Sequence, residues 1–131
     1  MPATDFLCVF GANGAGKTRL LRSIEQCRPE GDVMLVGTET LVDDMLRSLG
    51  HCRGLDEWRQ CYTTVNTLLL DNFWVLASRP HAAEVICHLI RDRGDAGKLT
   101  AVASDLPLTK WIEKNHGIAR LLMEGTIIHL T

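Results

Sequence analysis

The sequence predicts an α/β fold of three layers, in which helices cover both faces of a parallel β-sheet. Five short apolar runs are typical of strands, and several are continuous rather than alternating, as in a sheet with two buried faces. Helical patterns lie between these runs. A glycine-rich loop joins the first apolar run to the first helix, which is typical of phosphate-binding α/β domains.

Strands alternate with one or two helices along the chain. We expect strands at Phe6–Phe10, Val33–Gly37, Thr67–Leu70, Leu99–Ala103 and Thr126–Leu130. We expect helices at Thr18–Cys27, Thr38–Leu49, Leu55–Tyr62 and Pro80–Asp92, and two short helices within Leu108–Met123, broken near Asn115–Gly117. Glycine, proline and charged residues mark breaks at 28–32 and 93–97.

Length and composition indicate one soluble domain over residues 1–131, long enough to bury a core. The net charge of −2 gives no strong field for nucleic acid or an anionic membrane. No apolar run approaches the roughly 20 residues of a membrane span, and the N-terminus lacks a secretory pattern. The five scattered cysteines predict reduced, mostly buried thiols in a cytoplasmic protein. His51, Cys52 and Cys61 have a poor spacing for a metal site.

The segment from Gly11 to Thr18 fits the phosphate-binding loop pattern, Gly, four residues, Gly-Lys-Thr. Glycines allow successive backbone N–H groups to point at a phosphate, and the following helix presents its positive end to the same anion. We expect Lys17 to reach the β- and γ-phosphates and Thr18 to bind Mg²⁺. The alternative is a glycine turn that binds nothing. The nucleotide-binding residues are predicted to be Gly11, Asn13, Gly14, Ala15, Gly16, Lys17 and Thr18.

An acidic residue for the metal is expected at Asp71, which ends the apolar run from Thr67. Asp71 would bind Mg²⁺ directly or through water, although a carboxylate at that place can also be a simple strand-end cap. The next residue is Asn72, whose amide cannot accept a proton but can hydrogen-bond a water molecule. This predicts nucleotide binding with slow hydrolysis, unless Asn72 only caps the strand and another residue serves as the base.

Two polar residues, Ser104 and Asp105, follow the fourth predicted strand. The carboxyl ends of parallel strands face the ligand in such sheets, so either residue is placed to sense the γ-phosphate or to position water. Asp105 is also a suitable N-cap for the helix that follows Pro107, and the two roles are compatible.

With these landmarks, the chain resembles the AAA+ ATPase core of the DnaA and Hda replication initiator family over nearly its whole length. The resemblance implies a P-loop NTPase fold with sheet order 5-1-4-3-2, ATP or ADP and Mg²⁺ as ligands, and DNA replication as the setting. The matching segments are Phe6–Leu21 (first strand, Walker A loop and helix), Glu39–Met45 and Trp58–Tyr62 (initiator-specific helices), Leu68–Trp74 (Walker B), Ala103–Asp105 (sensor 1) and Ile118–Leu121 (arginine-finger segment).

The resemblance assigns Arg120 as an arginine finger that reaches the γ-phosphate of a neighbouring subunit. A guanidinium is always charged and matches phosphate oxygens, so the role is physically sound. The alternative is a surface arginine on the last helix. The family usually has a second Asp where this chain has Asn72.

The chain stops just after the fifth predicted strand, so we expect the family's helical lid, sensor 2 arginine and DNA-binding domain to be absent. An adenine base would then be open to water, and nucleotide affinity would be weak unless a partner closes the site. The family's initiator-specific helices bind single-stranded DNA. Here they mix both signs of charge, which favours a solvated helix face over a strong DNA groove. The charged residues concerned are Arg47, His51, Arg53, Arg59, Asp43, Asp44, Asp56 and Glu57.

Three functions are compatible with this sequence. The first is a reduced AAA+ nucleotide-binding protein that docks on an initiator or related ATPase and modulates it, and this is the function we favour. The second is a working ATPase in which Arg120 completes the site of the next subunit. The third is a P-loop scaffold that binds protein only.

Overall fold

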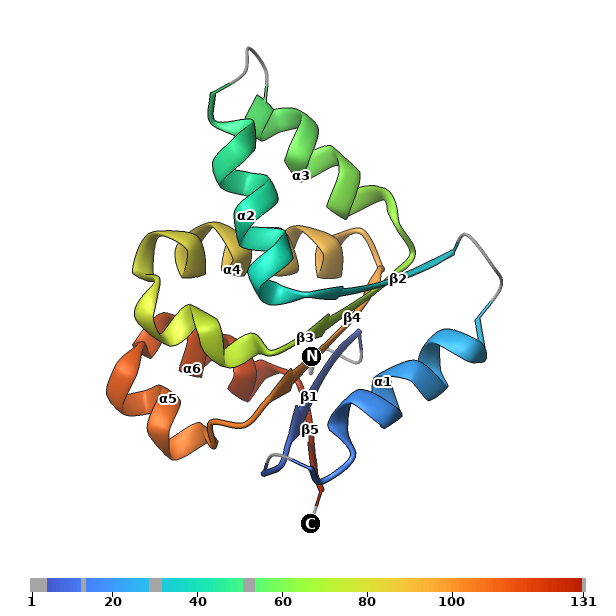
Figure 1. Cartoon of the computed structure of the whole chain (residues 1–131), viewed down its shortest axis with the longest axis vertical. Helices are drawn as coiled ribbons and strands as arrows, with labels where there is room; N and C mark the ends of the chain where they lie inside the picture. The colour runs from blue at the N-terminus through green and yellow to red at the C-terminus, as the bar shows by residue number, and fades with distance from the viewer. Residues whose placement is uncertain (1–4, 13, 29–31, 51–53, 131) are drawn as a thin grey trace.

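The computed structural model describes residues 5–12, 14–28, 32–50 and 54–130. Five strands form one parallel sheet in the order β2-β3-β4-β1-β5, which confirms the predicted order read from its other edge (Figure 1). The strands are β1 (Phe6–Phe10), β2 (Val33–Gly37), β3 (Thr67–Asp71), β4 (Leu99–Ser104) and β5 (Thr126–His129). The helices are α1 (Lys17–Gln26), α2 (Thr38–Ser48), α3 (Gly54–Thr64), α4 (Pro80–Asp95), α5 (Leu108–Lys114) and α6 (His116–Glu124), with a 3₁₀ segment η1 (Phe73–Ser78) after β3.

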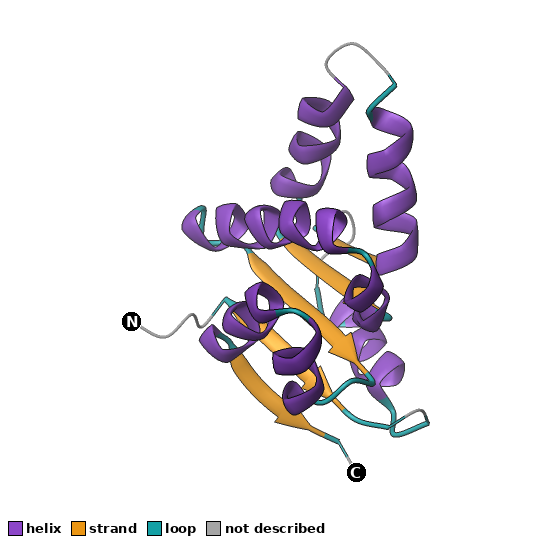
Figure 2. Cartoon of the chain, turned by 90° about the vertical axis from the view of Figure 1, so that its left-hand side faces the viewer, coloured by secondary structure: helices purple, strands orange, loops and turns teal. Residues whose placement is uncertain are grey.

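The sheet separates two apolar clusters, which gives the three predicted layers. Helix α1 covers one face, where Leu21 packs against Val9 and Leu69. The larger cluster fills the other face, beneath α4, α5, α6 and η1. Helices α2 and α3 lie at the β2 end of the molecule and extend away from the sheet as a pair (Figures 1 and 2). Strand residues therefore alternate between two buried faces, which explains the continuous apolar runs.

Most predicted boundaries are confirmed within one or two residues, and the differences have structural reasons. Strands β3 and β4 each continue one residue further than predicted, because Asp71 pairs in register with Gly37 and Ser104 pairs with Phe10. Helix α4 ends at Asp95 rather than Asp92. The glycine-rich segment after Asp92 indicated a break, but Arg93 is buried and its side chain anchors the end of the helix.

Arg93 has no exposed surface, and no pattern in the sequence indicated its burial. Its guanidinium donates to the backbone oxygens of Tyr62 (2.8 Å), Val65 (2.7 Å) and Leu99 (2.6 Å). Its Nε donates to the hydroxyl of Thr100 at 2.8 Å. Burial lowers the pKa of Arg93 to about 10, so the side chain stays charged at neutral pH. One side chain thus joins α4 to the α3–β3 connection and to the start of β4.

Candidate nucleotide-binding site

The loop after β1 has the backbone that a phosphate cradle requires. Gly14 and Gly16 both have positive φ angles, 88° and 99°, in the left-handed region that favours glycine. Helix α1 begins at Lys17, directly after Gly16, so its free N–H groups face the loop. The loop therefore combines backbone donors with a helix N-terminus, which is the arrangement that binds phosphate groups. Asn13 lies outside the described residues.

We expect Gly16→Ala to lower the free energy of unfolding by about 1–2 kcal/mol, because an L-residue is strained in the left-handed region. An added Cβ at Gly16 meets no atom within 4 Å, so the loss arises from the backbone alone. Gly94→Ala is the matched control, since Gly94 lies inside α4 and its added Cβ is equally unobstructed. Urea unfolding should show no loss for Gly94→Ala. Equal stability of the two variants would contradict the expectation.

Lys17 is buried, and its ammonium group makes three close contacts. Nζ donates to the backbone oxygens of Gly11 at 2.7 Å and Ala12 at 2.8 Å. It also forms an ion pair with Asp105 at 2.7 Å. Asp105 is therefore brought to the loop. Its additional role as the N-cap of the next helix is wrong, because no side chain in the described part of the chain caps that helix. Helix α5 begins at Leu108, with Pro107 at the N-cap.

Thr18, at the start of α1, and Asp71, at the end of β3, form a side-chain hydrogen bond. The Thr18 hydroxyl donates to Asp71 Oδ2 at 2.7 Å, and the other carboxylate oxygen accepts from the backbone N–H of Asn72 at 2.9 Å. A hydroxyl and a carboxylate are the hard oxygen ligands that Mg²⁺ takes from a protein when phosphates supply the rest. The donor set thus fits the predicted metal. Thr18 and Asp71 are the residues that would hold it.

Asn72 takes the left-handed conformation, with φ 55° and ψ 43°. Asparagine and aspartate both tolerate this region, so the backbone here does not require the amide. The side chain is exposed and makes no capping hydrogen bond to η1. The alternative role of Asn72 as a side-chain cap therefore has no support at this turn.

Ser104 has a structural role. Its buried hydroxyl accepts from Trp111 Nε1 and from the backbone N–H of Leu106, both at 3.1 Å, and it donates to the Leu106 oxygen. Trp111 is fully buried and stacks obliquely on Phe73, with ring centroids 5.8 Å apart. The Ser104 hydroxyl is therefore occupied by these hydrogen bonds. Of the two predicted residues, Ser104 and Asp105, it is Asp105 whose side chain contacts the loop.

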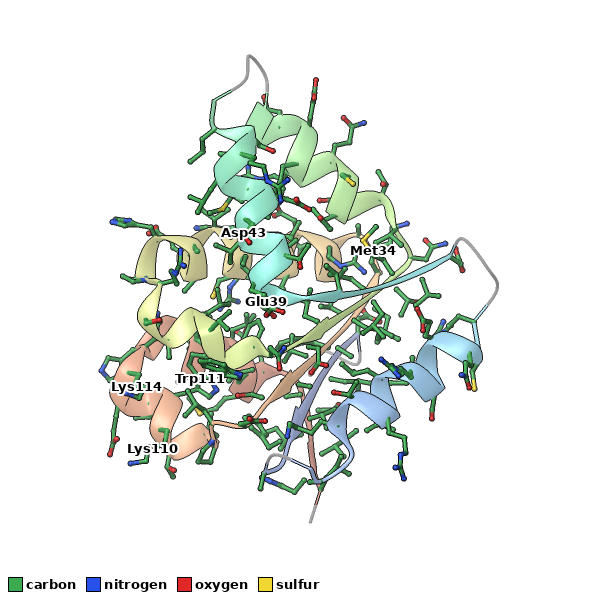
Figure 3. The ribbon with its side chains drawn as sticks, viewed as in Figure 1. Met34, Glu39, Asp43, Lys110, Trp111 and Lys114 are labelled. Carbon is green, nitrogen blue, oxygen red and sulfur yellow. The ribbon has the colours of Figure 1, made fainter. Side chains whose placement is uncertain are left out.

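A further acidic side chain, which the sequence did not place in the site, also lies at this edge. The carboxylate of Glu39, in the first turn of α2, packs over Gly37 at the end of β2 (Figure 3). Gly37 is the register partner of Asp71. No sequence pattern indicated this contact, because it depends on the pairing of β2 with β3.

The family is decided by comparison with known proteins. A family model described as the bacterial DnaA ATPase domain matches residues 2–127. The chain belongs to this family. The chromosomal replication initiator protein DnaA of Crocosphaera subtropica is 31% identical over 106 residues, which cover 78% of this chain and 23% of that protein. The chain thus spans about a quarter of the length of this curated relative.

Solved structures agree with the DnaA-type AAA+ fold. Domain III of the Thermotoga maritima replication initiation protein DnaA superposes with a TM-score of 0.87 at 28% identity, over 98% of this chain and 55% of that chain. The replication initiator DnaA bound to AMPPCP and single-stranded DNA superposes with a TM-score of 0.85 at 22% identity, over 96% of this chain and 40% of that chain. The predicted family and fold are confirmed.

The predicted arginine finger of this DnaA-type domain lies apart from the loop. Arg120 is exposed on α6 and lines a cavity of about 490 Å³ between α4 and the start of α6. Its neighbours there include Glu84, His88 and His116, and none of the described residues of the Gly11–Thr18 loop lines this cavity. The fold therefore brings Lys17, Thr18, Asp71 and Asp105 together but leaves Arg120 outside their cluster.

The helices α2 and α3 carry charges of both signs, as predicted. Arg47 forms an ion pair with Asp44 at 3.3 Å, and Asp44 also accepts from the Tyr62 hydroxyl at 2.7 Å. Part of the positive charge here is thus already compensated. His51 and Arg53 lie outside the described residues.

The cysteines of the described residues are free thiols, but they are less buried than predicted. Cys8 is buried and Cys87 is half-buried, and burial raises their pKa values to about 12 and about 11. Cys27 and Cys61 are exposed. Cys52 lies outside the described ranges. Among residues 5–12, 14–28, 32–50 and 54–130 no group of three His, Cys, Asp or Glu side chains is arranged to hold a metal.

None of the helices within the described ranges combines the length and the apolar character that crossing a membrane requires.

Proposed function

We propose that this chain binds ATP or ADP with Mg²⁺ through the Gly11–Thr18 loop, hydrolyses ATP slowly or not at all, and modulates a DnaA-like initiator or a related ATPase by protein contact. The observation that carries the proposal is the convergence of Lys17 and Thr18 with two carboxylates, Asp105 and Asp71, at the carboxyl ends of β4 and β3. The structural relative named as bound to AMPPCP supports a nucleotide as the ligand.

Different residues of the chain would bind the phosphates, the metal and the water. The loop N–H groups and the α1 N-terminus would hold the phosphates, and Lys17 would give up its contact with Asp105 to bind them. When bound, Mg²⁺ would neutralise phosphate charge. Slow hydrolysis follows from Asn72, because an amide accepts no proton from water. Asp105, released from Lys17, would then be placed to sense the γ-phosphate or to position water.

Arg120 supports a contact with another subunit. Its guanidinium is exposed and lies away from the loop of its own chain, so it is available to a neighbouring AAA+ domain. The same observation favours the second candidate, an ATPase whose homo-oligomer is completed by Arg120. Single-stranded DNA, named for one structural relative, is a weaker candidate ligand here because of the mixed charges on α2 and α3.

Calorimetric titration with ATP and Mg²⁺ tests the proposal, with Lys17→Ala and Arg120→Ala alongside. Binding without measurable turnover supports the regulator. Turnover that Arg120→Ala abolishes supports the oligomeric enzyme instead. Equal heats for the wild-type chain and Lys17→Ala would overturn both and leave a scaffold that binds protein only.

We expect Asn72→Asp to raise the ATP turnover at least about tenfold, because a general base typically contributes about 10²–10⁴-fold. The left-handed backbone at this position accepts aspartate, so the fold should not change. Phosphate release measured with saturating ATP and Mg²⁺ checks the effect. Gln60→Glu is the control, because it makes the same amide-to-carboxylate change at an exposed position of α3. A similar turnover for all three proteins would contradict the assigned role of Asn72.

A further inference from the structure

The site has a second carboxylate close to Asp71, and it comes from the neighbouring strand. A Cβ added to Gly37 would lie 3.0 Å from the carboxylate carbon of Glu39, so this carboxylate fills the space of the missing side chain. Gly37 pairs with Asp71 in the parallel β2–β3 ladder. Register partners on neighbouring strands are about 4.8 Å apart and point to the same face of the sheet.

That face is the one toward the phosphate loop. Val33, Leu35 and Leu69 pack with α1 residues, and strand side chains alternate, so position 37 and Asp71 share this face with them. The hydrogen bond from Thr18 confirms the direction of the Asp71 side chain. Glu39 therefore lies beside Asp71, on the side where the metal and the phosphates are proposed to bind.

Neither carboxylate forms an ion pair within the described ranges, although Arg79 lines the same pocket as Glu39. The ion pairs there join Lys17 to Asp105, Arg47 to Asp44, Arg91 to Glu124 and Lys110 to Glu113. Two neighbouring negative charges repel each other, and a cation between them would relieve the repulsion. Magnesium sites in nucleotide-binding proteins commonly use one or two carboxylates together with phosphates and retained water molecules.

We infer that Glu39 is the second acidic residue of the magnesium site, acting beside Asp71 through a metal-bound water. This inference rests on the proposed nucleotide function. We place a water molecule between Glu39 and the metal because Thr18 and Asp71 already supply protein ligands, and Mg²⁺ in nucleotide sites retains several water molecules. Gly37 is part of the same arrangement, since any larger residue would displace the carboxylate. A first-turn acid also stabilises α2 through the helix dipole, but that role affects stability and not metal affinity.

The test measures Mn²⁺ as a spectroscopic substitute for Mg²⁺. Electron paramagnetic resonance of free Mn²⁺ is followed during titration of the chain, without nucleotide and then with ADP. Glu39→Gln is expected to weaken Mn²⁺ binding about tenfold, the lower end of the effect of a residue that acts on a metal through its ligands. Glu57→Gln, an equal charge change in the first turn of α3, should bind as the wild-type chain does.

Gly37→Ala provides an independent variant that changes no charge. The backbone at Gly37 has φ −70° and ψ 142°, which alanine adopts freely, and the nearest atoms that the added Cβ would meet belong to the Glu39 carboxylate. Gly37→Ala should lose Mn²⁺ affinity as Glu39→Gln does, and the double variant should lose no more than Glu39→Gln alone. Glu39→Asp is not expected to keep the wild-type Mn²⁺ affinity, because its shorter side chain holds the carboxylate farther from the proposed metal site.

The outcomes separate this inference from the proposed function. Mn²⁺ binding by Glu39→Gln that equals that of Glu57→Gln overturns the inference, as does a wild-type chain that binds no Mn²⁺ under either condition. ADP binding that needs Lys17 would stand in both cases, and the nucleotide function with it. Conversely, Glu39-dependent Mn²⁺ binding without any ADP binding would leave a metal site and remove the nucleotide function.

Discussion

Replacing Arg93 with methionine is expected to lower the free energy of unfolding by about 3–5 kcal/mol, the largest stability effect we foresee for a single side chain. Methionine retains much of the apolar stem, so the loss would come from buried acceptors left without donors. Those acceptors are the backbone oxygens of Tyr62, Val65 and Leu99 and the hydroxyl of Thr100.

The matched control is Arg91→Met, two residues earlier on the same helix. Arg91 is exposed and pairs with Glu124 at 2.8 Å, so its replacement should change stability by less than about 1 kcal/mol. Urea unfolding followed by circular dichroism measures both variants. If Arg93→Met does not fold, Arg93→Lys keeps the charge and part of the hydrogen bonding and should give an intermediate, measurable loss. Equal stability of the Arg91 and Arg93 variants would show that the buried network is dispensable.

Lys17→Ala should weaken nucleotide binding about 10- to 100-fold. A hydrogen bond to a charged group contributes roughly 1.5–3 kcal/mol, and no other side chain of the loop is long enough to replace the Lys17 ammonium group at the phosphates. Fluorescence anisotropy with a labelled ADP measures the affinity in the presence of Mg²⁺. Lys114→Ala, an exposed lysine at the end of α5, is the control for loss of one positive charge.

The stability of the Lys17 variant must be followed beside its affinity. Removing the side chain leaves Asp105 without its ion-pair partner and frees the oxygens of Gly11 and Ala12. Asp105 is partly exposed, so water can replace this contact at small cost. Undiminished ADP affinity in a folded Lys17→Ala chain would contradict the phosphate-binding role of the loop.

Site residues that lie close together in the sequence could be predicted from it. The loop glycines, Lys17 and Thr18 act within one turn of chain, so their spacing alone indicates a phosphate site. Asp71 could be predicted because a carboxylate at the end of an apolar strand commonly binds the metal when such a loop precedes it in the chain. The sheet order followed from family resemblance rather than from periodicity, which cannot distinguish one strand order from another.

Features that depend on distant contacts could not be predicted. Arg93 stands near the end of a helix between charged neighbours, where an arginine is usually exposed. Its burial becomes understandable only when three backbone oxygens from two connections converge on it. Glu39 resembles an ordinary first-turn acid until Gly37 and Asp71 are aligned across two strands. The ion pair of Asp105 likewise needs β4 beside β1.

The hydrogen bond between the Trp111 indole and Ser104 gives the molecule a built-in optical reporter. Ser104 adjoins Asp105, whose carboxylate holds the loop lysine, so any ligand that draws this lysine away perturbs the surroundings of a wholly enclosed fluorophore. Emission from this ring can therefore report occupancy without a dye, once the other two tryptophans, the buried Trp58 and the half-exposed Trp74, are replaced to lower the background.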